Sequence, residues 1–105
     1  MEIQYLKEDK SLILKITEEL DHHTVEKIRR KADYEIEKYI PRKVILDFNR
    51  VSFMDSAGIG LILGRYKNVS ILGGKLEVVN VSNQVTKILN MSGLSKIVEI
   101  KEECA

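Results

Sequence analysis

Residues 55–60 combine a carboxylate, a hydroxyl and two glycines, and this segment has the clearest capacity for chemistry in the chain. It reads Asp-Ser-Ala-Gly-Ile-Gly, lies just beyond an apolar strand-like run, and opens an expected helix. Ser56 can be the N-cap of that helix, because serine is among the preferred capping residues. It can instead present its hydroxyl where free N–H groups and the helix dipole favour an anion. The residue pattern leaves both interpretations open.

Gly58 and Gly60 fall in the first turn of the same expected helix. Each glycine costs about 0.8–1 kcal/mol relative to alanine in a helix interior, so their presence needs a reason. A backbone without Cβ atoms lets another molecule approach closely, which predicts a contact surface here. The simpler alternative is that the glycines only accommodate a tight turn.

Three enzymatic or nucleotide-binding interpretations of this segment do not fit its spacing. A nucleophile elbow needs glycine two residues before the serine, and Met54 occupies that position. A phosphate-binding loop needs Gly-Lys-Ser/Thr, which does not follow the glycines. The lone pattern Gly58-x-Gly60 is weak evidence for a dinucleotide site. The spacing therefore supports none of these three sites, and we expect no bound cofactor.

Residues 21–24, Asp-His-His-Thr, form the other polar cluster. Adjacent histidines rarely point at one metal ion, and the single cysteine is at the far end of the chain, so metal-ligand spacing is absent. A relay of Ser56, a histidine and an aspartate is conceivable if the two segments share an edge of the fold. The commoner arrangement is a capped helix start with exposed imidazoles, and the sequence predicts no metal site.

Hydrophobic spacing predicts the elements that position these two clusters. Alternating apolar residues within 3–5 and 12–16, on either side of a charged turn, predict an antiparallel hairpin. Thr24 is the expected N-cap of a helix, and Pro41 ends that helix because a residue before proline disfavours the α region. The apolar face of this helix is formed by Val25, Ile28, Ala32, Ile36 and Tyr39.

Residues 43–48 have a continuous apolar centre, which is typical of an interior strand covered on both faces. A loop that ends near Asp55 or Ser56 leads from this strand to the helix that the glycines open. That helix ends at Gly73 and Gly74. Its apolar residues stand at positions 59, 62, 63, 66 and 69.

The last third of the chain continues the alternation of strand and helix. Residues 75–79 predict a strand, and Ser82 or Asn83 can cap a short helix that ends at Gly93. Residues 97–100 predict a last strand or an extended tail. The apolar residues of the short helix are Val85, Ile88, Leu89 and Met91.

The resulting order, β-β-α-β-α-β-α-β, predicts an α/β fold with one mixed sheet of four to five strands and packed helices. In open α/β sheets, ligands and partners usually meet the fold at the carboxyl ends of the strands. Residues 55–60 lie just beyond such an end, so the sequence predicts the functional surface there.

Composition and charge narrow the possible functions. The 105 residues, 44% of them hydrophobic, suffice for one core but not two, so we expect a single domain over 1–105. A net charge of +1 without a long like-charged block disfavours nucleic acid. The longest apolar stretch, 59–63, is too short to span a bilayer, and no secretory signal is visible. Cys104 is the only cysteine, so no internal disulfide is expected, and together these features predict a cytoplasmic protein.

Three motifs together resemble the STAS-domain family of anti-sigma factor antagonists. They are Leu-Asp-His-His-Thr at 20–24, Phe-Met-Asp-Ser-Ala-Gly-Ile-Gly at 53–60 followed by Ile-Leu-Gly-Arg-Tyr-Lys at 62–67, and Met-Ser-Gly-Leu at 91–94. The resemblance covers essentially the whole chain, and the combination is specific although each piece alone is weak. It implies a STAS-type fold and a partner-switching module rather than an enzyme.

The resemblance also implies a phosphorylation cycle. In this family an anti-sigma factor that is also a serine kinase phosphorylates the antagonist with ATP. The unphosphorylated antagonist binds that factor, usually in its ADP form, and releases a sigma factor, here implied to be the sporulation sigma factor F. A metal-dependent serine phosphatase reverses the modification. The alternative is a STAS module of a stressosome or of a nucleotide-sensing system, and a monomer is the default expectation for a mobile switch.

The family's functional residues transfer to this chain position by position. Ser56 matches the phosphoacceptor, and Asp55 matches the acid before it. Ala57 stands where some relatives have a second serine, which leaves one clear acceptor. Asp21 matches the acidic loop residue expected to face the partner. The residues that the resemblance assigns to partner binding are Asp21, Asp55, Ser56, Gly58, Ile59 and Gly60.

Overall fold

A computed structural model describes residues 1–102 and places five strands in one sheet. The strands lie in the order β1-β2-β3-β4-β5, with β1 and β2 antiparallel and all other neighbours parallel. This confirms the predicted α/β class, the mixed sheet and the N-terminal hairpin. The strands are β1 (Glu2–Leu6), β2 (Ser11–Lys15), β3 (Lys43–Asp47), β4 (Lys75–Val79) and β5 (Glu99–Lys101).

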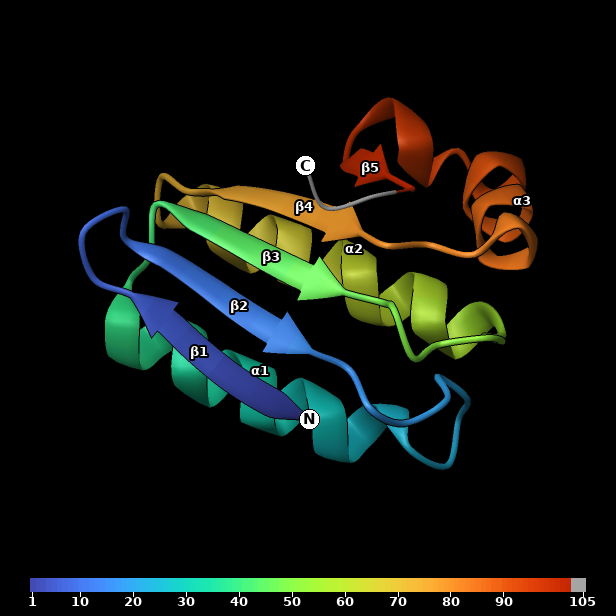
Figure 1. The fold of residues 1–105 in the computed structure, drawn as a ribbon, viewed down its shortest axis with the longest axis horizontal. Coiled ribbons are helices and arrows are strands. Elements are labelled where there is room, and N and C mark those ends of the chain that lie inside the picture. The colour runs from blue at the N-terminus through green and yellow to red at the C-terminus, as the bar shows by residue number, and fades with distance from the viewer. Residues whose placement is uncertain (103–105) are drawn as a thin grey trace.

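The helices follow the predicted order. Helix α1 (Val25–Tyr39) joins β2 to β3 and helix α2 (Ser56–Ile71) joins β3 to β4, and both lie on one face of the sheet (Figure 1). Helix α3 (Asn83–Ser92) lies beyond the carboxyl end of β4 (Figure 1). It is followed by a 3-10 turn, η1 (Leu94–Lys96), which the sequence pattern did not predict. Because η1 contains only three residues, it is too short to show a hydrophobic periodicity in the sequence.

The hydrophobic core lies between the sheet and helices α1 and α2. In β2 and β3 every second residue points toward these helices, so Leu12 and Val44 are completely buried. The predicted apolar face of α1 is confirmed, since Ile28 and Ile36 are buried and Tyr39 stacks on Tyr5 of β1. Burial of these side chains removes apolar surface from water and fixes the two helices on the sheet.

Strand β3 lies between β2 and β4 as predicted, but the expectation that both of its faces are covered was wrong. Val44 and Leu46 are at most 1% exposed, whereas Ile45 between them is only half-buried. Helices α1 and α2 lie on one face of the sheet (Figure 1). The burial of Val44 and Leu46 places their side chains on that face, and the alternation along a strand places Ile45, paired with Ile13 of β2, on the opposite face. A continuous apolar run does not reveal which of its two faces a helix will cover.

Two further positions differ from the predicted apolar pattern. In α2 the buried row includes Arg65 rather than only apolar residues, because its Nε lies 2.7 Å from Oδ1 of Asp33 on α1. In α3 Val85 and Leu89 are buried as predicted, but Met91 is 88% exposed. Met91 stands two residues after Leu89, so helical geometry turns it away from the buried face.

The ends of the elements agree closely with the local signals. Helix α1 ends at Tyr39 before Pro41, as predicted, and Ile40 between them adopts a left-handed conformation with φ 44°. Helix α3 has Ser82 as its N-cap and ends at Gly93, whose φ is 81°. Cys104 lies outside the described residues. Over residues 1–102, no helix combines the length and the apolar character needed to cross a bilayer.

Candidate functional site

The loops that follow β2 and β3 meet at the carboxyl edge of the sheet. An isolated parallel bridge pairs Leu20 with Met54. The backbone N–H of Leu20 donates to the oxygen of Phe53 at 3.4 Å, and the N–H of Asp55 donates to the oxygen of Leu20 at 3.0 Å. The bridge extends the pairing of two neighbouring parallel strands beyond their ends. It brings the two sequence-predicted clusters, residues 21–24 and 55–60, side by side.

A carboxylate reinforces this contact between the loops. Glu19 Oε1 accepts the backbone N–H of Ser52 at 3.0 Å, and Glu19 Oε2 accepts the Ser52 hydroxyl at 2.6 Å. Neither residue was predicted from the sequence to take part in the site. A lone Glu and a lone Ser separated by more than thirty positions carry no local signal, and only the parallel pairing of β2 and β3 makes them neighbours.

Thr24 is the N-cap residue of α1, as predicted, but its side chain makes no capping hydrogen bond, and Asp21 instead closes the turn that leads into the helix. Asp21 Oδ1 accepts the backbone N–H groups of His23 at 2.8 Å and of Thr24 at 3.1 Å. The hydrogen bond from the His23 backbone holds the pKa of the Asp21 carboxyl below its ordinary value. Thr24 occupies the N-cap position, but its hydroxyl donates to the backbone oxygen of Glu19 at 2.6 Å. Asp21 therefore remains ionised and ordered at the surface, 34% exposed in its side chain.

The start of α2 is capped by Asp55, which decides between the two interpretations of Ser56. Asp55 Oδ1 accepts the backbone N–H of Ala57 at 2.8 Å, so Asp55 is the N-cap and Ser56 is the first residue of the helix. The interpretation of Ser56 as the N-cap is wrong. Ser56 is exposed, and no group within residues 1–102 forms a hydrogen bond with its hydroxyl. An uncovered hydroxyl therefore stands at the positive end of a helix dipole.

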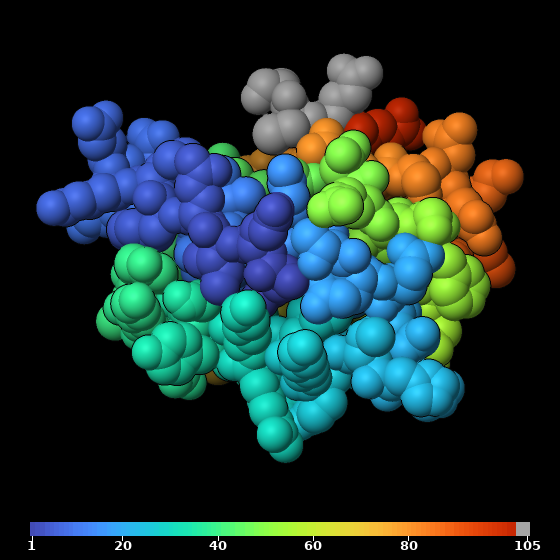
Figure 2. All heavy atoms as spheres, turned by 60° about the horizontal axis from the view of Figure 1, so that its bottom comes forward, coloured from blue at the N-terminus to red at the C-terminus, as the bar shows by residue number. Residues whose placement is uncertain are grey.

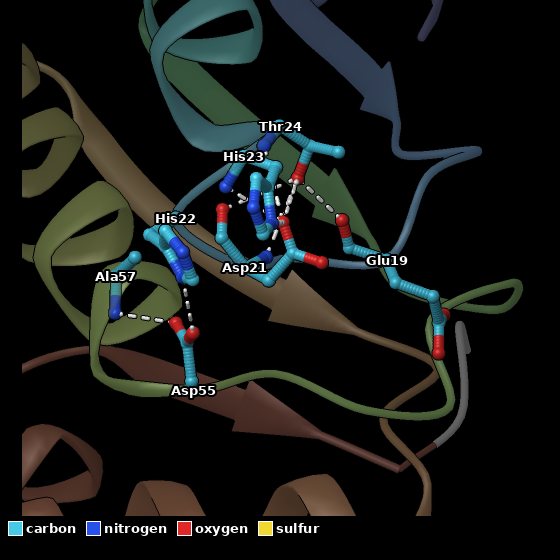
Figure 3. Close-up of polar contacts among 7 residues, drawn as sticks. All are labelled: Glu19, Asp21, His22, His23, Thr24, Asp55 and Ala57. Atoms are coloured by element: carbon cyan, nitrogen blue, oxygen red, sulfur yellow. Dashed lines mark hydrogen bonds and ion pairs between the residues drawn. The ribbon is translucent and has the colours of Figure 1, made fainter.

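His22 and His23 each lie against one of these two aspartates (Figure 3). His22 Nδ1 is 3.7 Å from Asp55 Oδ2, and His23 Nδ1 is 3.7 Å from Asp21 Oδ1. The two rings are tilted against each other with centroids 4.0 Å apart. Both side chains are about three-quarters exposed, at 74% and 77%, as the sequence analysis expected for a capped helix start.

This arrangement does not support a catalytic relay through Ser56. His22 contacts the carboxylate of Asp55, and within the described residues neither imidazole forms a hydrogen bond with the Ser56 hydroxyl. A serine nucleophile needs a base within hydrogen-bond reach. Among residues 1–102, no group of three or more His, Cys, Asp and Glu side chains could hold a metal ion.

The two glycines of the motif have different surroundings. A Cβ added to Gly58 would lie 2.9 Å from Cβ of Met54 and 3.3 Å from Cβ of Leu20. Gly58 is buried, so the close approach that it permits is that of the protein's own loops. Gly60 is exposed and has nothing within 4 Å of such an added atom. The predicted approach of another molecule to a bare backbone is therefore open only at Gly60, while Ile59 between them is half-buried.

The two loops form one continuous surface at this end of the molecule. Figure 2 shows the light-blue residues of the first loop directly against the yellow-green residues of the second. The surface carries two acidic side chains, two imidazoles and the Ser56 hydroxyl. Protein–protein contacts are made by exposed surfaces with a polar rim, whereas small molecules are bound in enclosed, mostly apolar pockets.

Comparisons with known proteins agree on one family. The STAS domain profile matches residues 2–105. The anti-sigma F factor antagonist of Paenibacillus polymyxa is 42% identical over 89 residues, which are 85% of this chain and 76% of that protein. The anti-sigma F factor antagonist of Lysinibacillus sphaericus is 36% identical over 84 residues, which are 80% of this chain and 72% of that protein.

Two solved structures extend the similarity to three dimensions. The structure of the anti-sigma factor antagonist SpoIIAA in its unphosphorylated form matches with a TM-score of 0.80 at 33% identity, covering 94% of this chain and 85% of that one. The Bacillus cell fate determinant SpoIIAA in its phosphorylated form matches with a TM-score of 0.71 at 32% identity, covering 94% and 88%. The same architecture is therefore known in an unmodified and a phosphorylated state.

Proposed function

The chain belongs to the STAS-domain family, and on that premise we propose that it is an anti-sigma F factor antagonist switched by phosphorylation of Ser56. The observation that carries the proposal is the uncovered hydroxyl of Ser56 at the start of α2, since Asp55 performs the capping in its place. Anti-sigma factor antagonists are non-enzymatic regulators, and an antagonist of this kind binds its anti-sigma factor.

The proposed switch is one phosphoester. The Ser56 oxygen attacks the terminal phosphorus of ATP held by the anti-sigma factor, the bond to ADP breaks, and the hydroxyl proton passes to a base of that kinase. The ester adds a charge of about −1.5 to −2 at pH 7. The helix dipole favours this charge by about 0.3–1 kcal/mol, which repulsion from Asp55 offsets, so the fold itself is expected to tolerate the modification.

At a docked surface the same charge has a larger effect. Juxtaposed like charges and an unpaired buried dianion cost several kcal/mol. The proposed partner surface consists of the Asp21 loop and the first turn of α2, where Asp55, Ile59 and Gly60 reach solvent in full or in part. Gly58 contributes from beneath, because its lack of a side chain lets the loops pack together.

The remaining parts of the proposal follow from the family. The partner is an anti-sigma factor and serine kinase that holds ADP or ATP, and a serine phosphatase restores the free hydroxyl. The chain itself acts as a monomeric STAS domain over 1–105 in the cytoplasm, releasing sigma factor F. It binds no cofactor in this role, because the nucleotide is held by the partner.

The test measures phosphorylation and binding with the cognate anti-sigma kinase. Incubation with kinase and ATP, followed by mass mapping, is expected to find one phosphate on Ser56 and none on Ser56→Ala. Ser56→Asp is expected to weaken the complex with the ADP-bound kinase by roughly two to three orders of magnitude. Calorimetric titration checks this value.

Ser70→Asp is the matched control for charge. Ser70 is exposed on the same helix, near its other end, so the substitution adds the same charge far from the proposed surface. It is expected to leave the affinity within about threefold. Phosphate on another residue, or a Ser56→Asp protein that binds as tightly as Ser70→Asp, would refute the proposal.

A further inference from the structure

His22 lies against the residue next to the proposed phosphoacceptor, and the proposed function gives it no role. Its Nδ1 is 3.7 Å from Asp55 Oδ2, while Asp55 Oδ1 accepts the backbone N–H of Ala57 at 2.8 Å (Figure 3). A single carboxylate therefore connects the imidazole to the first turn of α2. Asp55 and Ala57 are the two chain neighbours of Ser56, so His22 stands beside the site of modification.

The contact of His22 is close but does not fix the ring. A separation of 3.7 Å exceeds hydrogen-bond range, and the side chain is 74% exposed. The groups that face it are the carboxylate of Asp55 and the ring of His23, and His23 in turn faces Asp21 at 3.7 Å. His22 can thus turn toward a stronger anion nearby, whereas His23 is directed to the start of α1.

Phosphorylation would create such an anion one residue from Asp55. A phosphoserine carries more charge than a carboxylate and has three strong acceptor oxygens. It would also stand beside the negative charge of Asp55, so a neighbouring cation lowers the repulsion between them. Imidazole is the side chain whose charge changes in the physiological pH range, so it can supply that cation when a dianion is present.

We infer that His22 is the counter-cation of phosphorylated Ser56, turning from the Asp55 carboxylate to the phosphate oxygens once the ester forms. The inference rests on the proposed function and adds a positioning residue to it. It explains how the start of α2 accommodates a phosphate beside an acid through the turn of one exposed side chain. The charge of the modified site also depends on pH, because the second ionisation of a phosphoserine lies near neutral pH.

The test follows the phosphate of the full chain by phosphorus NMR as a function of pH. Phosphoserine is inserted at position 56 during translation, and the unsubstituted chain is compared with His22→Gln and His23→Gln. His22→Gln is expected to raise the midpoint of the second phosphate ionisation by about 0.5 pH unit, because the dianion loses its neighbouring cation. His23→Gln is the matched control and is expected to change the midpoint by less than half as much. Equal shifts, or no shift for His22→Gln, would overturn the inference.

Repeating the titration in an Asp55→Asn variant distinguishes a direct contact between His22 and the phosphate from an influence of His22 that acts through Asp55. Asparagine also caps helices well, so Asp55→Asn keeps the start of α2 while removing the competing charge. In this background, His22→Gln is expected to shift the phosphate midpoint by a similar amount. Loss of the effect there would show that His22 acts only on Asp55 and would contradict the inference.

The outcome is independent of the kinase, since translation supplies the phosphoserine. A kinase that leaves Ser56 unmodified would refute the proposed function while the phosphate titration could still succeed. A kinase that modifies Ser56, together with an unchanged midpoint in His22→Gln, would refute only the role of His22.

Discussion

The starts of α1 and α2 each combine an aspartate with a hydroxyl side chain and differ in the fate of that hydroxyl. Asp21 accepts two backbone N–H groups before α1 and Asp55 accepts one at α2, and at each start a histidine Nδ1 lies 3.7 Å from the carboxylate. At α1 the hydroxyl of Thr24 donates to the Glu19 backbone at 2.6 Å, whereas at α2 the hydroxyl of Ser56 has no partner within residues 1–102. An acidic cap thus satisfies the helix and leaves the serine available for reaction.

The largest expected effect concerns the packing that joins the two starts. Gly58→Ala places a Cβ 2.9 Å from Cβ of Met54, so the loops must separate, and the free energy of unfolding is expected to fall by about 1–3 kcal/mol. Gly60→Ala is the control in the same turn, where an added methyl group meets nothing within 4 Å. It is expected to stabilise by about 0.5–1 kcal/mol through helix propensity. Urea denaturation that finds equal losses for the two variants would contradict this assignment.

The second prediction tests whether the aspartates at both helix starts stabilise the protein. Asp55→Ala is expected to lower the free energy of unfolding by about 0.5–2 kcal/mol, and Asp21→Ala is also expected to lower it. The loss should be greater for Asp21, because it accepts two backbone N–H groups and Asp55 accepts one. The corresponding Asn variants should retain most of the stability in thermal unfolding, and an Asn variant as unstable as its Ala counterpart would argue against capping.

The contribution of the Asp21 carboxyl to stability should depend on pH in the acidic range. The hydrogen bond from the His23 backbone, followed by that from Thr24, holds the pKa of Asp21 below the ordinary value of 3.8. A carboxyl with a lowered folded pKa contributes stability that is present above its unfolded pKa and is lost as the pH falls through its folded pKa. The free energy of unfolding of Asp21→Asn should therefore fall less steeply below pH 3.8 than that of the unsubstituted chain. Denaturant titrations at several acidic pH values measure this slope, and identical slopes would contradict the prediction.

The two hydroxyls provide the most direct test of the difference between the starts. Thr24→Val removes a donor to the Glu19 backbone and is expected to cost about 0.5–1.5 kcal/mol. Ser56→Ala removes an exposed hydroxyl and is expected to change stability by no more than about 0.5 kcal/mol. Calorimetric unfolding of both variants measures the two losses of stability. A larger loss for Ser56→Ala than for Thr24→Val would contradict the prediction.

The smallest effect is expected for the side-chain clamp between the loops. Glu19 and Ser52 form two hydrogen bonds at an exposed position. A double-mutant cycle with Glu19→Gln and Ser52→Ala is expected to give a coupling energy of about 0.3–1 kcal/mol. A coupling near zero would show that Glu19 and Ser52 do not help to hold the loops together.

Local spacing determined the parts of the fold that the sequence could predict. Alternating apolar residues located the hairpin, and the helical period with its glycine and proline signals placed the three helices within one or two residues. The exceptions depend on contacts between elements. The buried Arg65 needs Asp33 on another helix, and the half-buried Ile45 depends on which face of the sheet the helices cover.

The features of the candidate site also fall into those that local sequence predicts and those that contacts between elements decide. The sequence by itself determined both polar clusters and singled out Ser56, because motif residues and helix starts are properties of short segments. Only the tertiary structure decided that Asp55 caps α2, that Gly58 packs inside, and that His22 reaches Asp55. These outcomes depend on the parallel pairing of β2 with β3, which brings the loops after the two strands to one edge of the sheet. Side chains that are far apart in the chain become neighbours there, and local sequence patterns carry no information about such contacts.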